Sequence, residues 1–457
     1  MRFVLLACLV ACACAPTVGG REPVSPTHRA LSTGAAEGVT ADGVTAWRGI
    51  RYATAGRWQA AMPVSGGEPI LADHFGPACP QDGQEQMVED CLYLNVWAPA
   101  GAGPGDALPV MVHVHGGGMR SGSGEITPEG LVRRGVIVVS FNYRLGNLGF
   151  FDYPLWGPDD LRNFALDDMV TALEWVDDNI EAFGGDRDRV TIAGHSAGGA
   201  NVQQQLLLPE ARGLFDQAIS RAGYAYTWPF REAANLSDDQ IAVIRVASLD
   251  SLRALPAADI VAQTPFFTMP WTGGPTLPDA PAEMIAAGQL APVPLITGGN
   301  SYDGAGVLYG TGLTPASWLA LWGDWQDEIE TLYAEDFAVS EAQAAQRLFG
   351  DARYVANAQA TAAAHAAHGN AAWLYFYDAP MPGQPGAPHG AETGQIFSDA
   401  PTPMQDYWVS FLENGDPAVV GLPDWQEAGT DAPSWMVFTP DPAPSDEVLA
   451  ERLALIE

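Results

Sequence analysis

A serine flanked by glycines is the residue of this chain best suited to chemistry. Residues 190–199 read VTIAGHSAGG, so a β-branched run leads into a G-x-S-x-G pattern, and small residues that can begin a helix follow. A serine hydroxyl is a weak nucleophile until a neighbouring base activates it. The pattern predicts a tight turn between a strand and a helix, which would expose Ser196 as a nucleophile.

A second glycine-rich stretch lies upstream and could supply hydrogen-bond donors. His115-Gly116-Gly117-Gly118 follows the apolar run 110–114. Acyl transfer needs N–H groups that point to where negative charge develops, and glycines let the backbone come close to that oxygen. We expect the N–H groups of Gly117, Gly118 and Ala197 to form an oxyanion hole.

Three histidines follow Ser196 in the chain, and one of them is suited to act as its base. His365 and His368 lie in an alanine-rich stretch that predicts a helix, and His368 would suit the negative end of its dipole, so both are interpreted as structural. His389 lies in a loop after the predicted strand 373–377. A base on such a loop can reach the serine turn, so His389 is predicted to be the base.

Two aspartates compete for the role of the acid that orients this histidine. Asp303 follows the predicted strand 294–297, and Asp378 directly precedes the loop that carries His389. Asp378 would have to turn back on its own segment, whereas Asp303 comes from a neighbouring strand end. We therefore predict Asp303 as the acid, which gives the chain order serine, acid, histidine.

The segments around these residues alternate between strand and helix patterns. Residues 164–183 show an apolar face at helical spacing and end at two glycines. Continuous apolar strands separated by helices indicate a buried, largely parallel sheet with helices on both faces. Further segments are predicted as strands over 110–114, 135–141, 190–193, 218–220, 294–297 and 373–377, and as helices over 352–368 and 440–457.

Residues 225–290 are less regular and rich in proline and aromatic residues, which predicts an insertion that caps the sheet. Its aromatic side chains either line a pocket or pack the cap against the sheet, and the pattern does not decide between the two. These side chains are Trp228, Phe230, Phe266, Phe267 and Trp271.

The composition bounds the partners of the chain. Its 457 residues are 47% hydrophobic and 17% charged, enough for one large α/β domain or two domains. There are 55 acidic residues against 21 basic ones, all arginine, and the formal net charge is −34. This charge argues against nucleic acid and anionic membrane surfaces as partners. No zinc-ligand spacing or phosphate-binding glycine loop is present, so no cofactor is expected.

The N-terminus has the pattern of an export signal. Residues 1–14 contain one positive charge and an apolar run too short to span a bilayer. The run ends at Leu9-Val10-Ala11-Cys12, which is similar to a bacterial lipobox and predicts a lipid anchor on Cys12; cleavage after Ala13 or Ala15 is the alternative. Residues 15–40 are predicted to be a flexible tether and residues 41–457 the folded domain. The chain is expected to be exported, either to the bacterial cell envelope or as a secreted or periplasmic protein.

Cys79 and Cys91 are the two cysteines outside this leader. An exported chain with two such cysteines favours one disulfide, and two buried free thiols are the alternative. On the loop-entropy argument a bridge would contribute about 3 kcal/mol.

Several blocks of the chain, in order, resemble the type-B carboxylesterases of the carboxylesterase/cholinesterase family. The resemblance implies an α/β-hydrolase fold and serine-dependent hydrolysis of small-molecule carboxylic esters through an acyl-enzyme, without a cofactor. It also implies a Cys79–Cys91 bridge and places the catalytic triad on Ser196, Asp303 and His389. Besides the two glycine motifs, the blocks are residues 47–53, 89–96, 142–146, 172–176, 179–180, 183–186 and 389–392.

The chain also departs from the family pattern. His195 replaces the acidic residue that usually precedes the serine, which weakens the case for choline esters, and Asp303 replaces a glutamate. Ala222 replaces a serine that often supports the triad, and Arg51 replaces a proline. A serine carboxylesterase is the expected function. A detoxifying esterase for a bulky natural ester is an alternative, and the intact residue set argues against a non-catalytic adhesion homologue.

Overall fold

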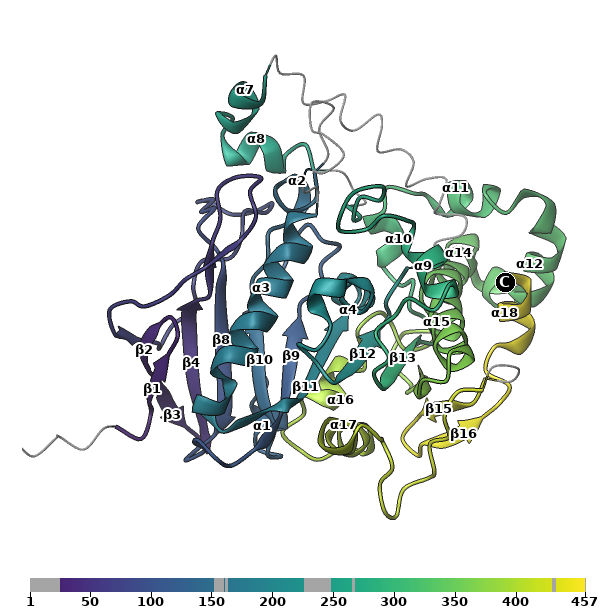
Figure 1. Ribbon diagram of the computed structural model, residues 1–457. Coiled ribbons are helices and arrows are strands. Elements are labelled where there is room, and N and C mark those ends of the chain that lie inside the picture. The colour runs from purple at the N-terminus through teal and green to yellow at the C-terminus, as the bar shows by residue number, and fades with distance from the viewer. Residues whose placement is uncertain are drawn as a thin grey trace, which may run out of the picture.

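A computed structural model describes residues 25–151, 160, 163–225, 248–264, 268–429 and 433–456. A twisted sheet of eleven strands runs through this part of the chain (Figure 1), in the order β16-β15-β14-β13-β12-β11-β9-β10-β8-β4-β3. The strands are β3 (Val39–Ala41), β4 (Val44–Arg51), β8 (Tyr93–Pro99), β9 (Leu108–Val114), β10 (Ile137–Phe141), β11 (Gly185–His195), β12 (Gln217–Arg221), β13 (Leu295–Asn300), β14 (Ala372–Tyr377), β15 (Trp435–Phe438) and β16 (Ala443–Ser445).

The central part of this sheet is parallel. From β10 through β9 and β11 to β15, every neighbouring pair of strands is parallel, and the antiparallel pairs lie toward the two edges. The carboxyl ends of parallel strands meet at one edge of a sheet. The loops after β9, β11, β12, β13 and β14 therefore open on the same side, as the sequence predicts.

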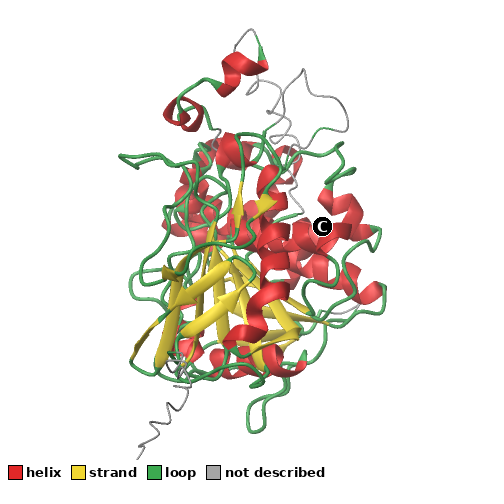
Figure 2. Ribbon diagram, turned by 60° about the vertical axis from the view of Figure 1, so that its left-hand side comes forward, coloured by secondary structure: helices red, strands yellow, loops and turns green. Residues whose placement is uncertain are grey.

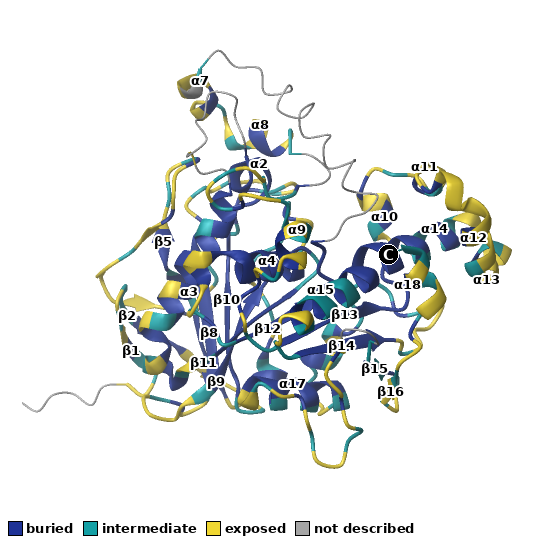
Figure 3. Cartoon of the chain, turned by 45° about the vertical axis from the view of Figure 1, so that its right-hand side comes forward, coloured by how far each residue is buried: buried dark blue, intermediate teal, exposed yellow. Residues whose placement is uncertain are grey.

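Both faces of the sheet are covered by helices (Figure 2), as predicted. Along β9 the side chains of Val110 and Val112 enter one apolar core and that of Met111 enters another, because successive residues of a strand point to opposite faces. The interior of the sheet is accordingly buried (Figure 3). The first core contains side chains of α3 (Phe164–Asn179), α4 (Ala197–Leu207), α14 (Glu341–Gly350) and α15 (Ala356–Ala367), and the second those of α1 (Glu129–Val132), α16 (Thr393–Ile396) and α17 (Pro403–Asn414).

The two long predicted helices are present with modified ends. The helix predicted over 164–183 is α3 followed by a 3₁₀ turn at Ile180–Phe183, and Gly184 ends it with a left-handed φ of 93°. The helix predicted over 352–368 begins as a π-helical turn at Asp351–Val355 and continues as α15. A π turn adds a residue to a helix and often marks a functional site.

The predicted tether over 15–40 is too long. The chain is already paired in β1 (His28–Leu31) and β2 (Gly34–Glu37), and β3 joins the large sheet. Gly34 has a φ of 119°, which permits the turn between β1 and β2, and Arg29 lies over the ring of Trp47. Glycine, proline and threonine, which predict flexibility, are equally common in the turns of hairpins, and a hairpin forms here.

The predicted C-terminal helix over 440–457 is wrong in its first half. Residues 443–445 form the edge strand β16, and the helix α18 (Ala450–Ile456) begins only after it. Pro444 lacks the N–H that a helix interior needs, whereas an edge strand tolerates proline.

The predicted cap insertion is described in part, and its described residues contain three short helices. They are α7 (Leu249–Arg253), α8 (Ala257–Val261) and α9 (Pro281–Ala286). Ile260 and Val261 of α8 pack with Trp58, Leu148 and Phe151 in a small separate core. Trp271 accepts a hydrogen bond from Asn163 on its carbonyl oxygen. Trp228, Phe230, Phe266, Phe267 and Cys12 lie outside the described residues.

The remaining strands and α-helices are short and lie around this framework. They are β5 (Ala53–Thr54), β6 (Met62–Pro63), β7 (Ile70–Leu71), α2 (Gly146–Gly149), α10 (Val307–Gly310), α11 (Pro315–Ala320), α12 (Gln326–Leu332) and α13 (Ala334–Val339). Within the described residues we find no helix with the length and apolar character that crossing a membrane requires.

Candidate active site

Ser196 occupies a strained turn between β11 and α4, as the sequence predicts. Its φ of 59° and ψ of −123° lie outside the regions that a non-glycine residue normally adopts. The N–H of Ser196 donates to the carbonyl oxygen of Arg221 at 2.8 Å, which ties the turn to the end of β12. Ser196 remains partly exposed, so its hydroxyl can meet a substrate.

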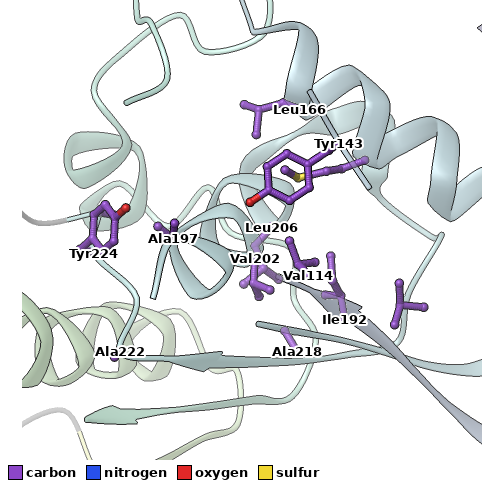
Figure 4. Close-up of a cluster of buried hydrophobic side chains, with 14 of the residues drawn as sticks. Val114, Tyr143, Leu166, Ile192, Ala197, Val202, Leu206, Ala218, Ala222 and Tyr224 are labelled. Carbon is purple, nitrogen blue, oxygen red and sulfur yellow. The ribbon is translucent and has the colours of Figure 1, made fainter. Parts of the chain in front are cut away.

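The glycines of this motif are required by contact. A Cβ on Gly194 would lie 2.3 Å from the carbonyl carbon of Gly198, and a Cβ on Gly198 would lie 2.1 Å from the carbonyl oxygen of Val114. Both distances are shorter than side chains permit, so the turn closes only with glycine at both positions. The strand and helix beside the turn are held by a buried apolar cluster (Figure 4), which includes Val114, Ile192, Val202, Leu206 and Ala218.

The glycine-rich loop after β9 lies directly against this turn. A Cβ on Gly116 would meet the carbonyl oxygen of His195 at 2.6 Å and the Cβ of Ser196 at 3.3 Å. Gly117 and Gly118 have φ values of 107° and 64° and are exposed. Among the residues that the structure describes, the N–H groups of these two glycines have no hydrogen-bond acceptor.

The base of the glycine loop is held by His115 and Tyr143. Their rings stack at 4.2 Å, and the Tyr143 hydroxyl donates to the carbonyl oxygen of His115 at 2.8 Å. Burial lowers the pKa of His115 to about 4, so its imidazole is neutral at ordinary pH. A neutral ring adds no positive charge to the candidate oxyanion hole.

A disulfide joins Cys79 and Cys91, as predicted, and its loop braces the glycine loop. The Oε1 of Gln81 accepts from the N–H of Gly122 at 2.8 Å, and its Nε2 donates to the carbonyl oxygen of Gly122 at 2.9 Å. The cross-linked segment is thereby connected to the residues that follow the three glycines.

The structure brings His389 to Asp303. His389 Nδ1 lies 2.6 Å from Asp303 Oδ1, and the Asp303 side chain is fully buried. The other oxygen of Asp303 accepts from the N–H of Asn300 at 2.7 Å. Asp378, the rival in the sequence, is exposed, and its N–H donates to the carbonyl oxygen of Phe438.

Two rings flank the imidazole of His389. Tyr354, from the π turn before α15, stacks on it with the ring centres 4.8 Å apart, and the His195 ring lies 4.4 Å away at an angle of 45°. Burial first, and then electrostatic interaction with His389 and Arg221, lower the pKa of His195 well below its usual value. His195, which replaces the acidic residue expected before the serine, is therefore uncharged.

A buried cluster behind His389 has no counterpart in the roles predicted from the sequence. Arg221 Nη1 lies 3.0 Å from Glu392 Oε1, and Asn300 Nδ2 donates to Glu392 Oε2 at 2.8 Å. Glu392 belongs to the block of residues 389–392 that the sequence indicates, but no local pattern indicates a role for Arg221. The other two histidines that follow Ser196 contact backbone carbonyl groups. His365 Nε2 lies 2.8 Å from the carbonyl oxygen of Val293, and His368 Nδ1 lies 2.9 Å from the carbonyl oxygen of Ala364.

A mostly parallel sheet with a serine turn after β11 and a histidine loop after β14 is the architecture of an α/β-hydrolase, the fold class predicted above. Solved structures agree with this class. A PNB esterase has a TM-score of 0.80 at 27% sequence identity, over 95% of this chain and 100% of that chain. A carboxylesterase of Geobacillus stearothermophilus has a TM-score of 0.79 at 27% identity, over 94% of this chain and 100% of that chain.

Sequence comparisons then identify the family. The model of the carboxylesterase family matches residues 25–318, and the chain belongs to this family. Para-nitrobenzyl esterase of Bacillus subtilis (strain 168) is 36% identical over 312 residues, which are 61% of this chain and 63% of that protein. Fumonisin B1 esterase of Sphingopyxis macrogoltabida is 31% identical over 449 residues, which are 90% of this chain and 81% of that protein. These relationships define a carboxylic ester hydrolase.

Proposed function

We propose that the chain hydrolyses carboxylic esters through an acyl-enzyme formed on Ser196. The observation that supports this best is the hydrogen bond between His389 and the buried Asp303, at the strand edge where Ser196 also lies. Asp303 fixes the imidazole with its Nδ1 protonated, which leaves Nε2 as the base for the serine proton. Ser196 Oγ then attacks the ester carbonyl carbon.

The tetrahedral intermediate formed by this attack carries a negative oxygen. The N–H groups of Gly117, Gly118 and Ala197 are the proposed donors, and the close approach of Gly116 to the serine turn supports this assignment. The first N–H groups of a helix have no partner inside it, and among the described residues the N–H of Ala197 has no other acceptor.

Collapse of the intermediate breaks the bond to the alcohol. The imidazolium of His389 gives its proton to the leaving alkoxide, and the acyl group stays on Ser196. His389 then removes a proton from water, whose oxygen attacks the acyl carbon, and the second intermediate releases the carboxylic acid and restores the serine.

A bulky natural ester is the second candidate substrate. The relative that acts on fumonisin B1 spans most of this chain, which supports a site that accepts large esters. Higher kcat/KM on a bulky ester than on small aryl esters would establish this alternative, and the reverse order would remove it.

Export and lipidation of the N-terminus are also proposed, on the lipobox-like residues that end at Cys12. Mass spectrometry of the mature N-terminus tests this. A diacylglycerol adduct on Cys12 supports an anchored enzyme, and a free N-terminus after Ala13 or Ala15 supports a secreted or periplasmic one.

Hydrolysis of p-nitrophenyl esters from acetate to long acyl chains tests the proposed function, with Ser196→Ala beside the wild type. We expect the variant to lose several orders of magnitude in kcat, and a fluorophosphonate probe to label the wild type alone. Equal activity of the two proteins would overturn the proposed mechanism. A folded wild type that neither hydrolyses esters nor reacts with the probe would favour the adhesion-type alternative.

A further inference from the structure

The proposed mechanism uses Ser196, Asp303 and His389, but it leaves a charged cluster behind His389 without a role. This cluster consists of Arg221 at the end of β12, Asn300 at the end of β13 and Glu392 in the histidine loop. The Arg221 side chain is 3% exposed and that of Glu392 is fully buried. Burying two charges costs several kcal/mol per ion before their attraction is counted. Such a pair needs an explanation other than simple stability.

Asn300 contacts both the acid and the loop of the base. Its backbone N–H donates to Asp303 Oδ2 at 2.7 Å. Its side-chain Nδ2 donates to the carbonyl oxygen of Pro388 and to Glu392 Oε2, each at 2.8 Å. One residue thus holds Asp303, the backbone directly before His389 and the carboxylate that follows it.

The histidine loop has further ties to the same segment. The N–H of Tyr302 donates to the carbonyl oxygen of Ala387 at 2.9 Å, and the N–H of Ala387 donates to Ser301 Oγ at 2.8 Å. These bonds fix the loop before Pro388. Beyond His389, Gly390 has a φ of 77°, and Glu392 is the next point at which a side chain holds the loop to β12 and β13.

The charge of Glu392 acts close to the imidazole as well as on the loop. Glu392 Oε1 lies 3.9 Å from Nε2 of His195, whose ring packs against His389. Since His195 is neutral, Arg221 is the cation that compensates this carboxylate. Loss of either charge would change the electrostatic potential at His389.

We propose that Asn300 is a positioning residue for the catalytic pair and that the Arg221–Glu392 ion pair holds its side chain in place. Asn300 fixes the distance between Asp303 and His389 by bonding to both segments. The ion pair supplies the acceptor for Asn300 and keeps the net charge behind the imidazole near zero. This inference deepens the proposed function and rests on it.

Asn300→Asp is the first test, because it keeps the shape and the backbone N–H but removes the Nδ2 hydrogen bond to the carbonyl oxygen of Pro388. A shift of the imidazole by a fraction of an ångström slows proton transfer, so we expect kcat on p-nitrophenyl acetate to fall about tenfold to hundredfold with KM within about twofold. The added carboxyl group takes the place of the Nδ2 donor beside the buried carboxylate of Glu392, and two carboxyl groups in contact share one proton. The net charge behind the imidazole is therefore unchanged, and the acidic limb of the kcat/KM profile should stay in place.

Glu392→Gln is the second test and should move this limb. The glutamine oxygen still accepts from Asn300, but Arg221 loses its counter-charge, which disfavours the imidazolium. We expect a lower kcat and an acidic limb at lower pH. A shift of the limb in Glu392→Gln without one in Asn300→Asp is not expected from general damage to the fold. Around His389 the described titratable or charged groups are Asp303, His195, Tyr354, Glu392, Arg221 and, behind His195, His113.

Asn95→Asp is the matched control. Asn95 is also buried, and its Nδ2 donates to the carbonyl oxygen of Gly124 and to Ser140 Oγ, each at 3.1 Å. The substitution likewise removes a buried amide donor, but outside the catalytic pair. We expect lower thermal stability with an unchanged pH profile and kcat within about twofold of the wild type.

The outcomes separate this inference from the function on which it rests. If Ser196→Ala is inactive but Asn300→Asp and Glu392→Gln keep kcat within about threefold and leave the acidic limb in place, the positioning role is wrong. The same conclusion holds if Asn95→Asp shifts the limb equally. If Ser196→Ala retains wild-type activity, the proposed function itself fails. Should Asn300→Asp not fold, the limb shift of Glu392→Gln still decides.

Discussion

Gly116 lies where the glycine loop meets the serine turn, and its substitution tests the proposed oxyanion hole. The Cβ of an alanine at this position would lie 2.6 Å from the carbonyl oxygen of His195, whereas real Cβ contacts stay beyond 3.0 Å. The loop and the turn must separate by about 0.4 Å or more. The oxygen of His195 belongs to the backbone of β11, so the exposed glycine loop is the part that moves.

This displacement should weaken the stabilisation of the transition state. Donors of an oxyanion hole act at 2.7–3.1 Å, and the loss of one donor costs roughly 10²–10³ in kcat, or about 3–4 kcal/mol. We expect Gly116→Ala to lower kcat by about 10²-fold and to leave KM within about threefold, because the developing charge is absent from the bound substrate. Steady-state hydrolysis of p-nitrophenyl butyrate measures both constants. A trifluoromethyl ketone inhibitor, which forms a tetrahedral adduct, should bind more weakly by a similar factor.

Gly66→Ala is the matched control outside the site. Its added Cβ meets nothing within 4 Å, although its φ of 65° makes alanine strained by about 1–2 kcal/mol. This variant should therefore lose some thermal stability but keep its kcat. A folded Gly116→Ala enzyme with wild-type kcat would refute the reasoning, as would an equal loss of kcat in both variants.

Three other outcomes follow from the same contacts. Asp303→Asn should lower kcat about 10³–10⁴-fold with little change in KM, because the amide favours the wrong tautomer of His389; steady-state kinetics with circular dichroism as a check of folding measures this, and a loss below tenfold would contradict it. Replacing Cys79 and Cys91 by serine should lower the free energy of unfolding by about 3 kcal/mol, and a reducing agent should lower the melting temperature of the wild type but not of the variant. Burial raises the pKa of Asp351 from 3.8 to about 6, so the carboxyl group of Asp351 ionises at lower pH in the unfolded chain than in the folded one. The free energy of unfolding of the wild type relative to Asp351→Asn should therefore fall between about pH 4 and pH 6, by roughly 2–3 kcal/mol at most. A constant difference in melting temperature between the two proteins across this range would exclude the shift.

The elements that the sequence predicts well are those whose pattern depends on local chemistry. Continuous β-branched runs place β9, β10 and β11, and the glycine after residue 183 ends the helix α3 at the expected point. Asp303 is preferred to Asp378 through the geometry of neighbouring strand ends, and the structure has the same pairing with His389. In each case a short segment contains the information.

The features that the sequence does not predict depend on contacts between distant segments. Arg221 is one of 21 arginines, and only the return of the chain to Glu392, 171 residues later, gives it a role. Pairing within 28–41 is hidden because glycine and threonine are as common in hairpins as in tethers. The neutral state of His195 likewise follows from burial, which no local pattern reports.

The spread of the site along the chain has a consequence for how the protein matures. Asp303 and His389 are 86 residues apart, and they meet at the ends of β13 and β14, which pair in the sheet beside β12 and β11. Contacts between distant segments form slowly, because loop-closure entropy opposes them until neighbouring strands are in place. During synthesis the serine turn leaves the ribosome long before His389, so the nascent chain holds the proposed nucleophile without its proposed base. The time at which esterase activity appears therefore marks the pairing of β14 with β13, and refolding experiments can use it to follow this step.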